Sequence, residues 1–187
     1  MKQLTYRRGT GALPGVMTAQ HPRRLTLRDG TAVDVRPLER TDRAGIEHVF
    51  SRLSDRSRYL RFTAIKAQLT ERELNRLLDV DHHDREALLA IDPITRRGVA
   101  IVRYVDIPGE PGALELAATV ADDWQGRGLG SALLAQLTER AREEGHSALR
   151  ASVLATNARS IAMLREAGFT PRSRGGVLLE YELPLGR

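Results

Sequence analysis

A glycine-rich stretch, DDWQGRGLGSALL, carries the clearest chemical signal in the sequence and spans Asp122 to Leu134. Three of the six residues from Gln125 to Gly130 are glycines, and an apolar helical pattern follows at once. The first amides of a helix have no partner within the helix, and the helix dipole adds positive potential there. Glycines let the chain curl so that successive N–H groups converge on phosphate oxygens. The stretch therefore predicts an anion site built from backbone amides, with Arg127 adding positive charge at the rim.

Two familiar phosphate-binding patterns do not fit this loop. The P-loop pattern needs Gly-Lys-Ser/Thr, and the loop contains no lysine. The dinucleotide-binding pattern needs G-x-G-x-x-G, whereas these glycines run G-x-G-x-G without a surrounding β-α-β-α series. On the loop alone, a purely structural turn stays open as an alternative to a phosphate site.

The elements around the loop define how it would be positioned. ALELAATV, residues 113–120, is a predicted strand that leads into it. A helix over about 129–144 follows, with apolar residues at every fourth position, and Gly145 ends it. SALRASVL, residues 147–154, is the next predicted strand. A strand, a helix and a second strand in this order indicate a parallel crossover.

The remaining patterns predict a mixed α/β single domain. Its central sheet is mostly antiparallel, with one parallel crossover and helices on both faces. Asp29-Gly30 and Asp92-Pro93 mark hairpin turns. Thr70 with Glu73 is a capping-box pattern at a helix start. We expect a loose arm over 1–22, a domain over 23–187 and these further elements: strands within 25–38, 87–91, 98–105 and 177–183, and helices within 41–53, 54–62, 70–80 and 158–167.

Composition excludes several classes of protein. The chain has 187 residues, enough for one domain with a full core, and no cysteine for disulfides or thiolate metal sites. It contains no apolar run near the roughly 20 residues of a membrane helix and no secretory signal pattern, so we expect a cytoplasmic protein. The net charge is +5, but the basic residues are interleaved with acids and aromatic residues make up only 4%. Specific nucleic-acid binding is therefore not expected, whereas a phosphorylated cofactor is compatible with the charge.

Two motifs together resemble the GNAT N-acetyltransferase superfamily. Gln125-x-x-Gly128-x-Gly130 resembles its acyl-CoA-binding signature Q/R-x-x-G-x-G/A. About 27 residues later, NARSIAMLREAGF resembles the family's second motif, in which an Asn starts a short helix that ends in Gly-Phe. In the N-terminal half, LRDGTAVDVRPLERTD, LSDRSRYLRF and VDHHDREALLAI resemble the acetyltransferase domain of bacterial Pat-type protein lysine acetyltransferases. Pat-type proteins often add a cyclic-nucleotide-binding or ligase-like domain, and we expect neither here.

The resemblance implies direct transfer of acetyl from acetyl-CoA, as co-substrate, to an amine. A lysine-like amine has a pKa of about 10.4 and is mostly protonated near neutrality, so a base must remove a proton before it attacks. Glu115 lies ten residues before Gln125, where several family members carry a general-base glutamate. A carboxylate partly shielded in a cleft would suit this role, either directly or through a water. The alternative is a solvent-facing strand residue.

The resemblance also implies a set of cofactor-binding residues and no metal. Backbone groups of Ala118, Thr119 and Val120 would bond the pantetheine arm and polarise the thioester carbonyl. Asn157 would bond the pantetheine or acetyl end, or is simply the N-cap of the next helix. The loop residues that would hold the pyrophosphate are Gln125, Gly126, Arg127, Gly128, Leu129, Gly130 and Ser131.

One position departs from the family pattern. Many members have a Tyr four residues before the Gly of Gly-Phe, where it protonates the departing thiolate, and here that residue is Leu164. Water, another group or unaided departure of the thiolate would have to serve instead.

Three other features have two readings each. The run Asp81–Asp84 contains two histidines, but no distant histidine partner is evident, which favours a polar turn over a metal site. The patch Arg58–Phe62 is either a helix that buries Leu60 or Phe62 and exposes its arginines, or a lining of the acceptor cleft. Trp124 is expected to pack against the helix rather than stack on adenine.

The sequence leaves the acceptor, the oligomeric state and any regulation open. A protein lysine is slightly favoured over a small amine as acceptor. A non-catalytic acyl-CoA-binding regulator would keep the loop but would not need Glu115. A basic nucleic-acid-binding protein is the third hypothesis.

Overall fold

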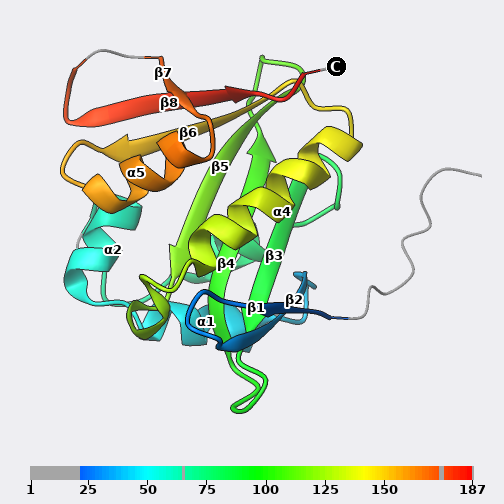
Figure 1. Ribbon diagram of the computed structural model, residues 1–187, viewed down its shortest axis with the longest axis vertical. Helices are drawn as coiled ribbons and strands as arrows, with labels where there is room; N and C mark the ends of the chain where they lie inside the picture. Colours follow the sequence, from blue (N-terminus) through cyan, green and yellow to red (C-terminus); the bar gives the residue numbers. More distant parts are fainter. Residues whose placement is uncertain (1–21, 65, 173–174, 187) are drawn as a thin grey trace, which may run out of the picture.

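A single eight-stranded sheet forms the centre of the molecule, in the order β1-β2-β3-β4-β5-β6-β8-β7. The computed structural model describes residues 22–64, 66–172 and 175–186 (Figure 1), so the expected arm, apart from Pro22, lies outside the described residues. The strands are β1 Arg23–Thr26, β2 Ala32–Pro37, β3 Arg85–Ile91, β4 Gly98–Asp106, β5 Ala113–Val120, β6 Ala148–Leu154, β7 Thr170–Pro171 and β8 Leu178–Pro184. The helices are α1 Arg43–Ser51, α2 Asp55–Phe62, α3 Glu71–Leu78, α4 Leu129–Glu143 and α5 Ala158–Glu166, with a 3-10 turn at Asp122–Trp124.

The sheet has one parallel pair among the described strands, and it is short. β5 and β6 pair only from Ala113↔Ala148 to Glu115↔Arg150. Beyond Glu115 the two strands diverge, as Figure 1 shows. The predicted crossover is therefore confirmed, and the last five residues of β5 lack a β6 partner.

Helices cover both faces of the sheet, as the sequence predicts. Alternate residues of β3 point to opposite faces: Leu88 and Ala90 join the core beneath α4. Ala87, Leu89 and Ile91 join a second core beneath α1 and α3. The predicted four-residue repeat of α4 is buried: every fourth residue from Leu129 to Ala141 lies in the core. None of the described helices is long and apolar enough to span a bilayer.

Most predicted elements are confirmed to within two or three residues. The capping box of α3 is present, because Glu73 N donates to Thr70 Oγ1 at 3.3 Å and Thr70 N donates to Glu73 Oε2 at 2.9 Å. The sequence patterns did not reveal the 3-10 turn or β7, which have only three and two residues. Elements this short contain too few residues to show a hydrophobic period.

Gly98, at the start of β4, allows α1 to lie directly on the sheet. A Cβ at this position would lie 2.7 Å from the backbone oxygen of Gly45 in α1. Since backbone atoms cannot move aside as a side chain can, we expect Gly98→Ala to lower the free energy of unfolding by about 2 kcal/mol. Denaturant titration followed by circular dichroism measures this loss.

Gly45→Ala is the matched control. Its Cβ would meet Leu89 Cδ2 at 3.1 Å, which is the end of a side chain that can shift. Alanine also has the higher helix propensity, by about 1 kcal/mol, so we expect a change of less than about 1 kcal/mol. Equal stability of Gly98→Ala and the unmodified protein would contradict the close backbone contact.

Candidate active site

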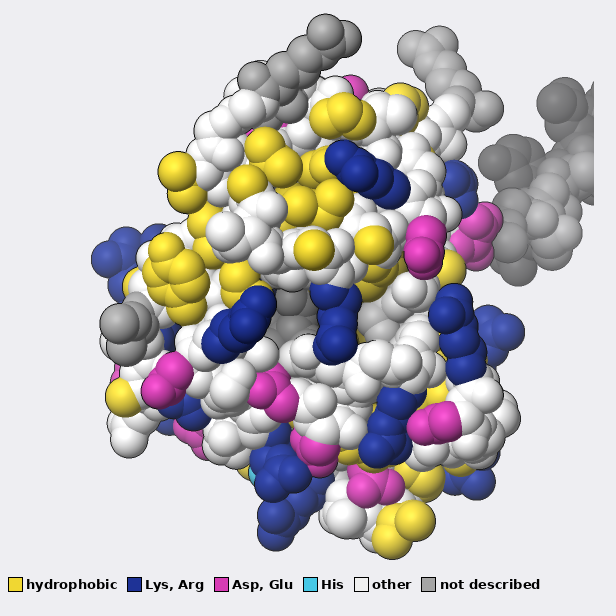
Figure 2. Space-filling view, turned by 60° about the vertical axis from the view of Figure 1, so that its left-hand side comes forward, with side chains coloured by type: hydrophobic (Ala, Val, Ile, Leu, Met, Phe, Trp, Pro, Cys, Tyr) yellow, Lys and Arg dark blue, Asp and Glu magenta, His cyan; other side chains and the backbone are white. Residues whose placement is uncertain are grey.

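A groove of about 610 Å³ lies where β5 and β6 diverge. Figure 2 looks onto this side of the molecule, where the surface recedes between basic side chains in the middle of the face. One wall is β5 from Glu115 to Val120, and the opposite wall is β6 with α5. The glycine loop closes one end, and Ser57, Leu60, Arg61 and Thr63 of the α2 region line another part of the rim.

Each loop glycine has a structural reason that needs no ligand. Gly126 and Gly128 have φ of 81° and 87°, the left-handed region that favours glycine. Gly128 is the N-cap of α4. A Cβ on Gly130 would lie 3.2 Å from Met163 Sδ, so its small size lets α5 pack against the start of α4. The glycines alone would therefore fit the structural-turn alternative as well as a phosphate site.

The backbone amides of the loop distinguish the two alternatives. The first hydrogen bond of α4 runs from Ala132 N to Gly128 O at 3.0 Å. The six amides from Gly126 to Ser131 have no acceptor within the described ranges. Gly126, Gly128, Gly130 and Ser131 line the groove. Unpartnered amides at a helix N-terminus, open to a large groove, are suited to binding the oxygens of a phosphate group.

Glu115 lies at the point where β5 and β6 separate, and its side chain is exposed. The expectation of a shielded carboxylate is therefore not met, although Glu115 lines the groove. It makes no ion pair with any described residue, because its cross-strand neighbour Arg150 binds Glu110 and Glu182 instead. An unpaired carboxylate at the groove can accept a proton without first breaking a salt bridge.

Residues 33–170 match the family described as "Acetyltransferase (GNAT) domain", which is more than half of the chain. The chain belongs to this GNAT acetyltransferase family. The expected resemblance to Pat-type proteins is also confirmed. The crystal structure of the GNAT domain of S. lividans PAT superposes with a TM-score of 0.80 and 31% identity, covering 87% of this chain and 96% of that one.

Two of the curated relatives that carry the name acetyltransferase illustrate the similarity. Acetyltransferase PA5475 of Pseudomonas aeruginosa is 35% identical over 122 residues, covering 64% of this chain and 65% of that protein. Acetyltransferase Pat of Mycolicibacterium smegmatis is 29% identical over 133 residues, covering 70% and 40%. The match thus spans less than two thirds of the length of either relative.

The side chain of Gln125, in the GNAT signature, links the loop to the end of β5 by hydrogen bonds. Its Nε2 donates to Val120 O at 3.0 Å and to Asp122 Oδ1 at 2.9 Å. Its Oε1 accepts from Arg159 Nη1 at 2.8 Å. The side chain therefore holds the loop in position beside the groove, and it reaches Arg159 on α5 across the groove.

The side chains of Arg127 and Leu129 lie away from the groove. Arg127 stacks over the Trp124 ring at 5.2 Å and lies 3.6 Å from Asp29, so its expected charge at the rim is directed elsewhere. Leu129 is 1% exposed in the core, and only its backbone amide can serve a ligand. Trp124 packs against the core and also lines the groove, so both of its alternatives stay open. Two arginines that sequence reasoning missed, Arg28 and Arg159, line the groove.

Asn157 has the capping role that was one of its two expectations. Its Oδ1 accepts from Ser160 N at 3.2 Å and caps α5. Asn157 also lines the groove, so contact with a bound molecule stays a prediction. Ala118, Thr119 and Val120 line the groove on β5, beyond the last residue paired with β6.

Leu164 lines the groove where many GNAT members have a tyrosine. No tyrosine is among the described residues that line it. Tyr104 and Tyr181 are 0% and 1% exposed, and burial raises the pKa of Tyr104, which makes it a poorer acid. Among the described residues, no tyrosine thus lies at the groove in place of the missing one.

Helix α2 agrees with the second of its two alternatives, in which it lines a cleft, and not with the first, in which it buries apolar residues and exposes its arginines. No residue of α2 is fully buried. Arg58 lies over the Phe50 ring at 4.9 Å, with only 18% of its side chain exposed. Arg61 Nε donates to Thr119 Oγ1 at 3.2 Å. Arg58 and Arg61 therefore point towards the body of the protein, and α2 lines the groove.

The histidine turn has a distant partner that the sequence did not reveal. One ligand atom each from His83, Asp84 and His146 lie within 4.8 Å of one another, a spacing that could hold a metal ion. His83 Nδ1 also lies 2.8 Å from Glu144 Oε2, and His146 Nε2 lies 3.1 Å from the His83 carbonyl oxygen. These contacts join the turn to the end of α4, and none of the three residues lines the groove.

Proposed function

We propose that this GNAT protein is an acetyl-CoA-dependent N-acetyltransferase that transfers acetyl directly to an amine, with residues 23–187 as the transferase domain. The observation that carries the proposal is the row of unpartnered amides from Gly126 to Ser131 at a groove that extends to Glu115. A regulator that only binds acyl-CoA would need the amides but not an unpaired carboxylate in the same groove.

In this proposal the groove residues divide between binding and orientation. The amides of Gly126–Ser131 bind the diphosphate, assisted by the positive end of the α4 dipole. Arg28 and Arg159 add positive charge beside the loop. Polar backbone groups of Ala118 and Val120, which have no β6 partner, bond the amides of the pantetheine arm.

Acetyl-CoA supplies an activated thioester carbonyl, and the protein prepares the amine that attacks it. Glu115 accepts a proton from the ammonium group, directly or through a water, which frees the nitrogen lone pair. A backbone N–H near the end of β5 stabilises negative charge on the carbonyl oxygen during attack. A C–N bond forms, the C–S bond breaks, and the thiolate takes a proton from water because Leu164 cannot supply one.

A protein lysine is the favoured acceptor, since the GNAT domain of S. lividans PAT and acetyltransferase Pat are among the similar proteins. A small amine is the alternative. Incubating the protein with labelled acetyl-CoA and a lysate of its source, then separating labelled proteins from labelled small molecules, distinguishes the two.

Two measurements test the proposed activity. Calorimetry should show 1:1 binding of acetyl-CoA, which is not expected of a basic nucleic-acid-binding protein. A free-thiol assay should show release of coenzyme A that depends on an added amine. Binding without amine-dependent release would favour the regulator, and no binding would contradict both hypotheses.

A further inference from the structure

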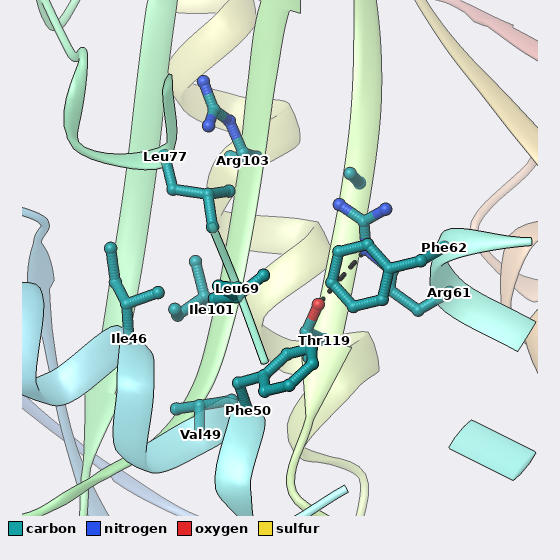
Figure 3. Close-up of a pocket in the computed structure, with 11 residues that line it drawn as sticks. Ile46, Val49, Phe50, Arg61, Phe62, Leu69, Leu77, Ile101, Arg103 and Thr119 are labelled. Atoms are coloured by element: carbon teal, nitrogen blue, oxygen red, sulfur yellow. Dashed lines mark hydrogen bonds between the residues drawn. The ribbon is translucent and has the colours of Figure 1, made fainter. Parts of the chain in front are cut away.

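A second cavity, of about 20 Å³, lies beside the groove where α1, α2 and α3 face the sheet. Figure 3 shows its walls, which are mainly apolar side chains such as Ile46, Phe50 and Leu77. Arg61, Ala117 and Thr119 line both this cavity and the groove, so the two spaces adjoin along β5. The cavity has room for about one water-sized group, such as a water or one oxygen of a carboxylate that reaches in from the groove.

Two arginines line this apolar cavity, and each has only a neutral hydrogen-bond partner. Arg61 donates to the Thr119 hydroxyl at 3.2 Å, the dashed line in Figure 3. Arg103 is 9% exposed and donates from Nη1 to the Arg76 carbonyl oxygen at 2.9 Å. Neither forms an ion pair with a residue in the described ranges. Buried charges are normally paired with an opposite charge. Arg103 is buried and Arg61 is half-buried between the cavity and the groove, so their two positive charges require an explanation.

The pKa values of Arg61 and Arg103 are both lowered, as expected where positive charge is in excess. Burial and, to a smaller extent, the charge of Arg103 lower the pKa of Arg61 to about 10, while Glu115 acts in the opposite direction. Burial also lowers the pKa of Arg103, against the influence of Asp79. With a pKa of about 10, Arg61 still carries its charge at neutral pH.

The register of β4 and β5 shows where the two arginines lie relative to Glu115, the proposed base. Glu115, Ala117 and Thr119 alternate along β5 and share one face of the sheet. Arg103 on β4 is the direct cross-strand partner of Ala117, so it lies on the same face. Two residues along a strand correspond to about 7 Å. The backbone of Glu115 is thus about one strand repeat from that of Ala117, which pairs with Arg103 and lines the cavity together with Arg61.

We propose that Arg61 and Arg103 form a subsite for a carboxylate carried by the amine acceptor itself. The acceptor is then a zwitterionic amine, either a free amino acid or a lysine next to an acidic residue in a peptide. The carboxylate would replace the missing counter-charge in the cavity, and the amine would lie at Glu115. This inference rests on the proposed N-acetyltransferase activity and narrows its acceptor class.

Matched acceptors test the subsite with the full chain and acetyl-CoA. Glycine, β-alanine and γ-aminobutyrate are each compared with their amides, and lysine peptides with a neighbouring Glu are compared with their Gln counterparts. Thiol release should give a kcat/KM at least about tenfold higher for the carboxylate member of a pair, as expected for a charge-assisted hydrogen bond. The pairs that show the preference identify the source as a free amino acid or a peptide.

Three variants distinguish a loss of carboxylate recognition from a general loss of the folded groove. Arg103→Met should raise the KM for the carboxylate acceptor about tenfold and leave its amide unchanged, whereas Arg103→Lys should keep part of the preference. Arg56→Gln removes one exposed charge from the same helix as Arg61 and should change neither acceptor. All three should keep the Kd for acetyl-CoA, which shows that the groove is intact.

Three outcomes would overturn the inference, two of them at the subsite alone and one at the proposed function. Equal use of acid and amide in every pair, or an equal loss for both in Arg103→Met, would overturn the subsite and leave the acetyltransferase activity standing. Failure of the unmodified protein to bind acetyl-CoA would overturn the proposed function, and the subsite with it.

Discussion

Glu115→Gln is expected to lower kcat for acetyl transfer by about 100-fold or more near neutral pH while leaving acetyl-CoA binding unchanged. Glutamine keeps the size of the side chain but cannot accept a proton, so the amine stays largely protonated and cannot attack. Because Glu115 has no ion pair with any described residue and its side chain is exposed, the substitution should cost little stability. A thiol-release assay measures kcat, and calorimetry measures the Kd for acetyl-CoA.

Glu139→Gln is the matched control for this experiment. Glu139 is an exposed carboxylate on α4 that pairs with Arg142 at 3.2 Å and does not line the groove. It should leave kcat within about twofold of the unmodified protein. If Glu115→Gln kept full turnover across the pH range, the base assignment would be wrong, and another group would have to deprotonate the amine.

The divergence of β5 and β6 explains how one short segment can serve both binding and chemistry. Pairing ends at Glu115, so the remaining backbone of β5 is open to the groove on one edge. The same residues alternate between two faces: Ala118 and Val120 pack on the α4 core, whereas Thr119 contacts Arg61 of α2. A bound molecule along this edge would therefore contact the loop at one end and the α2 face at the other.

Local patterns in the sequence predicted the loop, its helix and the parallel crossover. Glycines with positive φ and a four-residue apolar repeat are properties of short segments, so no distant contact was needed to identify them. The direction of Arg127 could not be predicted, because Asp29 comes from a hairpin almost a hundred residues earlier. His146 beside His83 is a contact of the same kind, made only when α4 packs on the sheet.

The α2 arginines show a different limit of sequence reasoning. A helix with Leu60 and Phe62 is expected to bury its apolar side, since that is how a helix joins a core. Here α2 lies at the edge of the groove rather than over the centre of the sheet, and none of its residues is fully buried. Arg61 could be assigned to the cavity only after the register of β4 and β5 was known.

Ser131→Pro is expected to weaken acetyl-CoA binding by about 10- to 100-fold with little loss of stability. Ser131 is the third residue of α4, and its amide has no acceptor among the described residues, so proline removes a ligand donor but no helix hydrogen bond. The preceding residue, Gly130, has no Cβ for the proline ring to contact, which reduces the usual penalty on the residue before proline. The expected factor corresponds to one hydrogen bond to a charged group.

Ser131→Ala separates the amide from the hydroxyl, because it removes the side-chain oxygen and keeps the backbone N–H. Its Kd for acetyl-CoA should stay within about threefold of the unmodified protein, so the difference between the two variants measures the amide alone. Calorimetry at two salt concentrations adds a further test, since attraction between amides at a helix N-terminus and a diphosphate weakens as salt rises. Unchanged affinity in Ser131→Pro, with the helix still folded by circular dichroism, would show that the unpartnered amides do not bind the diphosphate and that the glycines serve only the turn.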